Sequence, residues 1–208
     1  MHHHVIDDSE CGTPEDRIMF YDKLKTLPPG YKSHALEIGS YCGSMSSIFC
    51  NYFDKLTIIE NYTMHQCDNH TNTNSYNITY DTNGMYIKHV EMASDHKHLN
   101  RLDTMRYNLH GCNNYKIIET DFHDFKSDIK FDFVLDDITD TEADFFDVRW
   151  VIRNRDRLIK AFELVRDGGM YCLCWEYWFI KNRSSSSFIT KLLHMVRTGK
   201  GLVHPIVL

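Results

Sequence analysis

The chain alternates short apolar runs with amphipathic stretches over most of its length. Five runs have the length and residue content of buried strands. Between and after them, apolar residues recur at helical spacing. Strands that alternate with helices predict a mostly parallel sheet with helices on both faces, the doubly wound α/β arrangement of Rossmann-like folds. The predicted strands are Ala35 to Ile38, Leu56 to Glu60, Tyr115 to Glu119, Phe131 to Leu135 and Met170 to Cys174.

Capping residues support the helices that the spacing predicts. Thr13-Pro14 suits a helix start, and Pro28-Pro29-Gly30 ends this N-terminal helix within residues 13–30. Ile18, Tyr21 and Leu24 share one of its faces. Further helices are predicted at 44–53, around 99–109, over 148–165 and at 188–196.

Residues 61–95 are a long polar insertion between the second strand and the helix that follows it. Within it, Tyr76 to Tyr80 and Met85 to Val90 flank Asp81-Thr82-Asn83-Gly84. Asn-Gly between two such runs indicates a β-hairpin. The hairpin follows the carboxyl end of a strand, where open α/β sheets bind ligands. It is therefore expected either to cover a site or to decorate the surface.

The C-terminal edge of the sheet is predicted to be short. After the fifth strand, only Leu202 to Leu208 has the pattern of a strand, and Pro205 restricts it to an edge position. A second copy of the chain or another partner is therefore expected to complete this edge.

Length and hydrophobicity favour one globular domain. With 208 residues, 42% of them hydrophobic, the chain can bury a full core, so residues 1–208 are taken as one domain. No apolar run has the length of a membrane span, so no membrane partner is expected. The run His2 to His4 is short for a purification tag and is left out of the predicted fold.

Charge and cysteine content limit the expected partners and the expected cellular compartment. A net charge of −6 disfavours nucleic acid as a partner. Seven cysteines without framework spacing or a secretory signal indicate free thiols in a reducing compartment, so a cytoplasmic protein is expected. The richness in Asn, Tyr, Ile and His is typical of AT-rich genomes, including viral ones.

The end of the first predicted strand carries the strongest functional signal. Leu36-Glu37-Ile38-Gly39-Ser40-Tyr41-Cys42-Gly43 leads from a buried strand through a glycine turn into a helix that begins at Ser44. Glycine permits positive φ and a close approach of ligand to the main chain. The helix start offers N–H groups and a positive dipole end to a carboxylate or phosphate. The segment therefore predicts binding of the polar part of a nucleotide-like cofactor.

The spacing acidic-x-Gly-x-x-x-Gly distinguishes this loop from two common alternatives. A dinucleotide fingerprint would need glycine at Tyr41, and a P-loop would need Gly-Lys-Ser/Thr. The loop resembles motif I of class I S-adenosylmethionine-dependent methyltransferases, and is most similar to the catechol O-methyltransferase-like small-molecule O-methyltransferases. The resemblance extends from Ala35 to Trp175. It implies S-adenosylmethionine as cofactor, bound in this loop by Glu37, Gly39, Ser40, Tyr41 and Gly43.

Two other strand ends carry residues suited to the rest of that cofactor. Glu60 ends the second strand, and a carboxylate there can accept hydrogen bonds from both ribose hydroxyls. The family has an acidic residue at this position. After the third strand, the resemblance implies that Asp121 accepts from the adenine amino group and that Phe122 stacks on the ring. A solvent-exposed acid beside a core phenylalanine is the alternative.

Asp136 and Asp137 end the fourth strand and are the predicted catalytic residues. One carboxylate can take a proton from an acceptor hydroxyl, or ligate a divalent cation that acidifies it. The family binds magnesium at the position of Asp136, which makes Asp136 and Glu176 the candidate Mg²⁺ ligands. Two departures oppose a metal: Trp175 stands at a ligand position, and Ile138-Thr139 stand where the family has a lysine base.

The predicted function is S-adenosylmethionine-dependent O-methylation of a small-molecule acceptor. One alternative is a non-catalytic cofactor-binding or scaffold domain of the same fold. Another is RNA methylation with a partner that supplies basic surface. The arginines of the 148–165 helix fall on several faces and are interpreted as solvated surface residues: Arg149, Arg153, Arg155 and Arg157.

Overall fold

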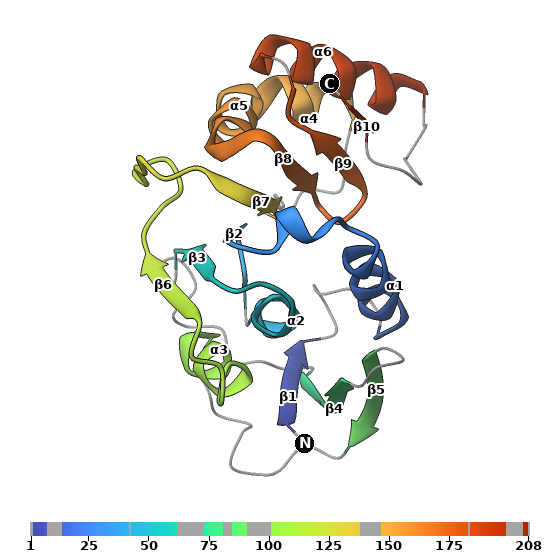
Figure 1. The fold of residues 1–208 in the computed structure, drawn as a ribbon, viewed down its shortest axis with the longest axis vertical. Coiled ribbons are helices and arrows are strands. Elements are labelled where there is room, and N and C mark those ends of the chain that lie inside the picture. Colours follow the sequence, from blue (N-terminus) through green and yellow to red (C-terminus); the bar gives the residue numbers. More distant parts are fainter. Residues whose placement is uncertain are drawn as a thin grey trace.

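The structure is a computed structural model. It describes residues 2–7, 14–41, 43–61, 73–80, 85–90, 101–137, 147–182, 184–198 and 206–207. Its main sheet has seven strands in the order β10-β9-β8-β7-β2-β3-β6 (Figure 1). Five neighbouring strands of this sheet are parallel: β2 (Ala35–Ile38), β3 (Leu56–Glu60), β6 (Tyr115–Glu119), β7 (Phe131–Asp136) and β8 (Val165–Leu173).

The order of the strands creates a switch point between β2 and β7. From β2 the chain proceeds outward to β3 and β6, and then returns to place β7 on the other side of β2. Ile38 and Asp136 are register partners at the carboxyl ends of these two strands. Open α/β sheets bind ligands at such a point. The predicted mostly parallel α/β fold is confirmed, and it brings the glycine loop to this point.

Helices cover both faces of the sheet (Figure 1). One face packs against the helices α1 (Pro14–Lys25), α2 (Ser44–Tyr52) and α3 (Arg101–Asn108). The other face packs against α4 (Val148–Arg153), α5 (Arg155–Leu164) and α6 (Ser185–Thr198). A short 3₁₀ helix, η1 (Pro29–Tyr31), follows α1.

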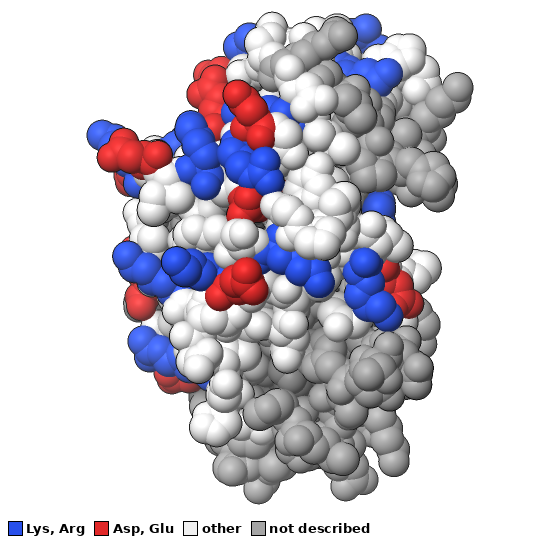
Figure 2. All heavy atoms as spheres, viewed as in Figure 1, with Lys and Arg blue, Asp and Glu red and all other residues white. Residues whose placement is uncertain are grey.

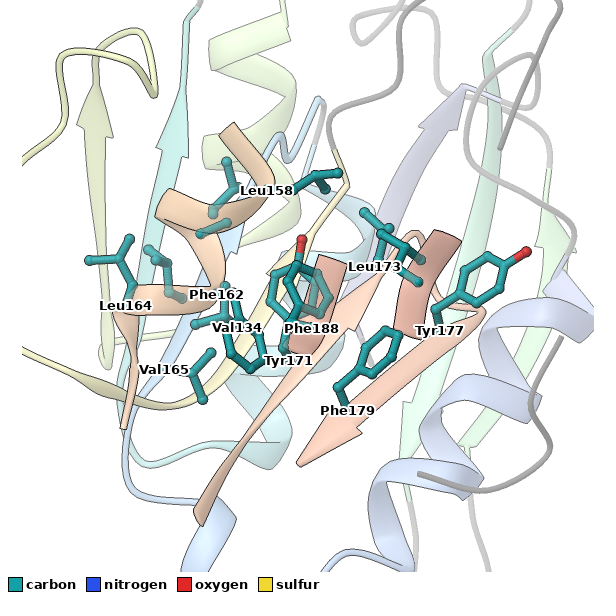
Figure 3. Close-up of a cluster of buried hydrophobic side chains, with 14 of the residues drawn as sticks. Val134, Leu158, Phe162, Leu164, Val165, Tyr171, Leu173, Tyr177, Phe179 and Phe188 are labelled. Carbon is teal, nitrogen blue, oxygen red and sulfur yellow. The ribbon is translucent and has the colours of Figure 1, made fainter. Parts of the chain in front are cut away.

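Strand alternation divides the core into two clusters. Successive side chains of a strand point to opposite faces, so Leu135 joins the α1, α2 and α3 side while Val134 joins the α4, α5 and α6 side. Figure 3 shows the second cluster, where Tyr171 of β8 lies among aromatic and aliphatic side chains of the sheet and helices. The Phe162 and Phe188 rings of α5 and α6 stack with centroids 4.3 Å apart.

The predicted hairpin of the 61–95 insertion is confirmed. β4 (Thr73–Tyr80) and β5 (Met85–Val90) are antiparallel, and the turn between them lies outside the described residues. β1 (His2–Asp7) pairs with the other edge of β4. Setting His2 to His4 aside was therefore wrong. In this three-stranded sheet, β1 lies next to α2 and α3, and β5 lies next to α1 (Figure 1).

Two predicted elements have different bounds in the structure. The predicted 148–165 helix is two helices that meet at Asn154. β8 begins at Val165 rather than Met170 and includes Gly168 and Gly169. A Cβ at Gly169 would lie 3.0 Å from the Asp132 carbonyl oxygen of β7, so glycine here permits the close approach of two strands.

The C-terminal edge of the sheet differs from the expectation. β9 (Tyr177–Ile180) follows β8 through the turn Cys174-Trp175-Glu176 and pairs with it in antiparallel fashion. β10 (Ile206–Val207) is a two-residue strand beyond β9. Sequence reasoning missed β9 because its turn has no glycine or asparagine, although Cys174 and Trp175 both adopt positive φ. Within the described part of the chain, no helix is both long and apolar enough to cross a membrane.

Candidate functional site

The glycine loop joins the end of β2 to the start of α2. Its backbone is left-handed at Gly39 (φ 78°), Tyr41 (φ 52°) and Gly43 (φ 77°). The Gly43 N–H donates to the Ser40 carbonyl oxygen at 2.8 Å, which closes the turn. A Cβ on Gly43 would lie 2.9 Å from Cγ of Met105 in α3, so this position has no room for a side chain. Cys42 lies outside the described residues.

Glu60, at the end of β3, is hydrogen-bonded to this loop. Its Oε2 accepts from the backbone N–H groups of Ser40 and Tyr41, each at 2.7 Å. Its Oε1 accepts from the Asn61 N–H at 3.0 Å. The strand-end acid and the loop N–H groups, which sequence reasoning assigned to ribose and to the polar end of a ligand, therefore meet at one place.

Glu37 lies beneath the loop rather than on its ligand side. It is fully buried, and its Oε2 accepts from Oγ of Ser46 in α2 at 2.5 Å. This bond ties β2 to α2 and so fixes the direction in which the helix leaves the loop. Direct contact with a cofactor, as predicted for Glu37, does not fit this position because the carboxylate faces the interior.

The two residues after β6 differ in exposure. Asp121 is partly exposed, and its Oδ1 accepts from the His123 N–H at 2.7 Å. Phe122 is buried in the cluster on the α5 side. Lys160 of α5 lies over its ring, with Nζ 4.9 Å from the centroid, and donates to the Phe122 carbonyl oxygen at 2.6 Å. A ring that is packed in this way does not fit the stacking role predicted for Phe122.

Asp136 lies in a buried polar cluster on the α5 side of the sheet. Arg157 of α5 donates from Nη1 to its Oδ1, and the Tyr171 hydroxyl donates to its Oδ2 at 2.7 Å. The Asp136 side chain is 0% exposed and that of Arg157 is 7% exposed. Both carboxylate oxygens are therefore engaged, and the catalytic and metal-binding roles predicted for Asp136 do not fit its surroundings.

Electrostatics keep Arg157 charged and Tyr171 protonated. Burial opposes the Arg157 charge, but the neighbouring Asp136 carboxylate raises the pKa of Arg157 above its usual value. Burial, together with the same carboxylate, raises the pKa of Tyr171 well above its usual value, so the phenol stays protonated and donates. Because Arg157 Nη1 and the Tyr171 hydroxyl both donate to the buried Asp136 carboxylate, the cluster is structural.

Asp137 points to the opposite face, as strand alternation requires. Its N–H donates to the Ile38 carbonyl oxygen at 2.8 Å, so it lies at the switch point between β7 and β2. Its Oδ2 accepts from Nε1 of Trp175 at 2.9 Å. The Trp175 ring lies beside Phe20 of α1, with centroids 5.8 Å apart. Asp137 and Trp175 are both partly exposed, and they present a carboxylate beside an aromatic wall.

The described residues do not fit a magnesium ion. Asp136 is held by Arg157 and Tyr171, and Trp175 offers no ligand atom. Glu176 is exposed in the β8–β9 turn. Among the residues with described side chains, no three His, Cys, Asp or Glu residues gather as metal ligands would. Asp136 and Glu176 therefore do not fit the predicted Mg²⁺ site.

The interpretation of Arg157 as a solvated surface residue was wrong. Arg149, Arg153 and Arg155 are exposed, as expected, but Arg157 is buried. Its spacing held a signal, because Arg157, Ala161 and Leu164 recur at i, i+4 and i+7 and share the buried stripe of α5. An arginine on such a stripe indicates a buried acidic partner.

Charges on one face of the molecule are mixed. Figure 2 shows Lys and Arg interspersed with Asp and Glu among the described residues, without one large basic area. This view agrees with the acidic net charge of −6 and offers no support on that face for a nucleic-acid groove.

Comparisons with known proteins concern the architecture. No protein-family model matches the chain, and no curated protein matches it. Several solved methyltransferase structures are similar to it in fold. N-methyltransferase NodS from Bradyrhizobium japonicum WM9 is 12% identical with a TM-score of 0.47, over 91% of this chain and 84% of that one. In its complex with S-adenosyl-L-homocysteine, the match covers 76% of this chain and 60% of that one, at 14% identity and a TM-score of 0.46.

Two other methyltransferases have different acceptors. CalS10, a SAM-bound amino pentose methyltransferase from Micromonospora echinaspora, is 15% identical with a TM-score of 0.43, over 76% of this chain and 49% of that one. The tRNA (m1A58) methyltransferase TrmI from Aquifex aeolicus is 14% identical with a TM-score of 0.46, over 93% of this chain and 56% of that one. The chain spans about half to three-fifths of three of these four matched chains. Similarity at this level does not decide a family, so the function is inferred from the residues of the site.

Proposed function

We propose that this chain is an S-adenosylmethionine-dependent methyltransferase that acts on an oxygen atom of a small molecule. One observation carries the proposal. At the switch point of the sheet, a loop with three left-handed residues presents its Ser40 and Tyr41 N–H groups to the Glu60 carboxylate. A strand-end carboxylate held beside a glycine loop at a switch point is an arrangement suited to the ribose of a nucleotide-like cofactor.

The residues that would hold this cofactor fit the chemistry of its parts. Gly39, Ser40, Tyr41 and Gly43 would form the loop beneath its polar end, and Glu60 would accept from its ribose hydroxyls. Glu37 would position α2 from below, through Ser46. When bound, S-adenosylmethionine supplies an electrophilic methyl group on a sulfonium sulfur. The protein then has to orient the acceptor and remove one proton.

Asp137 is the proposed residue for that proton. It lies at the switch point, is partly exposed, and its Oδ2 is oriented by the Trp175 indole at 2.9 Å. Trp175, which packs against the buried Phe20, gives the acceptor an aromatic surface. A carboxylate next to an acceptor hydroxyl can take its proton as the methyl group is transferred.

Asp137→Asn is expected to reduce the rate of methyl transfer by about 10²- to 10⁴-fold, the range for a lost general base. The amide oxygen can still accept from Trp175, so binding of S-adenosylhomocysteine should be unchanged. Single-turnover transfer of labelled methyl groups, with calorimetry in parallel, measures both quantities. Trp175→Phe is the comparison variant, because it keeps an aromatic side chain and removes the N–H donor to Asp137. Full activity of the Asp137→Asn variant would show that Asp137 is not the general base.

Glu60→Ala is expected to weaken binding of S-adenosylhomocysteine by about 1.5–3 kcal/mol, or roughly 10- to 150-fold, the range for hydrogen bonds to a charged group. Calorimetry measures the change. Glu119→Ala is the matched control, because Glu119 ends the adjacent strand in register with Glu60 and is exposed. If the two variants bind S-adenosylhomocysteine with equal affinity, Glu60 does not take part in cofactor binding.

A non-catalytic cofactor-binding domain is the second candidate. Its support is that Arg157 and Tyr171 engage Asp136, and that Trp175 occupies a ligand position of the family that the loop resembles. Calorimetry with S-adenosylhomocysteine tests the cofactor that both candidates share. Transfer of labelled methyl groups to small phenols, sugars and RNA then separates them. Binding without transfer to any acceptor supports the second candidate, and absence of binding contradicts both.

A further inference from the structure

One of the two Glu60 carboxylate oxygens is fully used by the protein itself. Oε2 accepts from the backbone N–H groups of Ser40 and Tyr41, each at 2.7 Å, and Oγ of Ser40 lies 3.5 Å from the same oxygen. A carboxylate oxygen has two lone-pair sites for hydrogen bonds. Both sites of Oε2 are therefore filled before any ligand binds.

The other oxygen of Glu60 still has room for a donor. Oε1 accepts from the Asn61 N–H at 3.0 Å, and no second donor from the described residues reaches it. The Glu60 side chain is partly exposed at the carboxyl end of β3. One lone-pair site of Oε1 is therefore left for a hydroxyl that a ligand brings.

The glycine loop holds Oε2 in place. The left-handed backbone at Tyr41 turns two successive N–H groups toward one point, the arrangement that binds anions. Ser40 is only 6% exposed, so its N–H would lose its acceptor away from water if Glu60 turned outward, which is costly. The Gly39 N–H also donates to the Ile59 carbonyl oxygen at 3.0 Å, which ties the loop to β3 next to Glu60. The carboxylate is therefore the internal anion of this loop.

We propose that Glu60 accepts from only one of the two ribose hydroxyls of the cofactor, because its other oxygen is committed to the glycine loop. This inference rests on the proposed function and narrows its ribose contact. The sequence alone suggested that both hydroxyls would bind this carboxylate. In the structure, one hydroxyl binds Oε1 and the second one is left to water or to another group. Glu60 thus shapes the loop and selects the cofactor with different atoms.

Two analogues of S-adenosylhomocysteine, the 2′-deoxy and the 3′-deoxy compounds, test the ribose contact by calorimetry. Loss of the hydroxyl that Oε1 accepts should weaken binding to the wild type by roughly 10- to 150-fold, the range for a hydrogen bond to a charged group. The same loss should leave the affinity of Glu60→Ala nearly unchanged. The other analogue should change affinity by the same factor in both proteins. Glu119→Ala is the matched control and should behave as the wild type does, because Glu119 is exposed at the end of the adjacent strand.

Amide hydrogen exchange, followed by NMR in the protein without cofactor, tests the loop contact separately. The Ser40 and Tyr41 amides should be protected in the wild type and should exchange at least about tenfold faster in Glu60→Ala, since each loses a charged acceptor. The Gly39 amide, which donates to the backbone of β3, is the internal reference and should stay protected. If Glu60→Ala does not fold, Glu60→Gln replaces it in the analogue test, because its amide oxygen can hold the loop while its nitrogen cannot accept from ribose.

The results separate this inference from the proposed function. If the wild type does not bind S-adenosylhomocysteine, the proposed function is wrong, and the ribose contact fails with it. If S-adenosylhomocysteine binds and both analogues show a loss that depends on Glu60, the single contact is wrong while the proposed function stands. The same conclusion follows if neither analogue shows such a loss, or if the Ser40 and Tyr41 amides of the wild type exchange as fast as those of Glu60→Ala.

Discussion

Arg157→Met is expected to lower the free energy of unfolding by about 3–5 kcal/mol, the loss seen when one partner of a buried ion pair is removed. The variant would leave the Asp136 carboxylate fully buried, with the Tyr171 hydroxyl as its one remaining side-chain donor among the described residues. This loss is a large part of the roughly 5–15 kcal/mol that stabilises a typical domain. Urea unfolding, followed by tryptophan fluorescence and circular dichroism, measures it.

A variant on the same helix provides the control. Arg155 forms an exposed ion pair with Asp156 at 3.4 Å, with side chains 55% and 92% exposed. Arg155→Met should leave the unfolding free energy nearly unchanged, because exposed pairs contribute little. Replacing the whole cluster by Asp136→Leu, Arg157→Met and Tyr171→Phe should restore most of the stability, since no buried charge then lacks a partner.

These variants also decide what Asp136 does. If Arg157→Met unfolds at the same urea concentration as Arg155→Met, the cluster is not structural, and a catalytic role for Asp136 becomes open again. If the triple variant is folded and still transfers methyl groups, Asp136 takes no part in the chemistry.

Gly39→Val is expected to abolish measurable binding of S-adenosylhomocysteine. Gly39 has φ 78°, which a β-branched residue adopts only with strain, and it lies directly after β2 at the switch point. A valine side chain would also occupy the space through which a ligand approaches the loop. Calorimetry of the wild type and the variant tests this, with circular dichroism to confirm that the variant is folded.

Gly30→Val is the matched control for this change. A Cβ at Gly30 would meet no atom within 4 Å, and no positive φ is found there. The Gly30→Val variant should therefore bind S-adenosylhomocysteine as the wild type does. Equal affinity of the wild type, Gly30→Val and Gly39→Val would contradict the cofactor assignment, and with it the proposed function.

Local sequence patterns determined most of the parallel sheet. The runs Ala35 to Ile38, Leu56 to Glu60 and Tyr115 to Glu119 have the same bounds in the structure. The first two are buried parallel strands, which are continuous apolar segments bordered by breakers, and the third is a partly exposed edge strand. The glycine loop and Glu60 were also predictable. Both end adjacent parallel strands, and such ends meet at one edge of the sheet. The Asn-Gly hairpin was readable for the same reason, since a turn is a local signal.

Other features depended on pairing between distant segments. β1 needed an edge of β4 to pair with, and the β8–β9 turn uses left-handed Cys174 and Trp175 without glycine, so neither had a local signal. Sequence placed Asp136 and Asp137 together at a strand end. Because strand side chains alternate, the two carboxylates point to opposite faces of the sheet. Only the packing of the tertiary structure determined which side chain each carboxylate contacts. Arg157 binds Asp136 in the core, while Trp175 leaves Asp137 at the edge of the site, because burying a charge requires an opposite charge that the fold alone brings within reach.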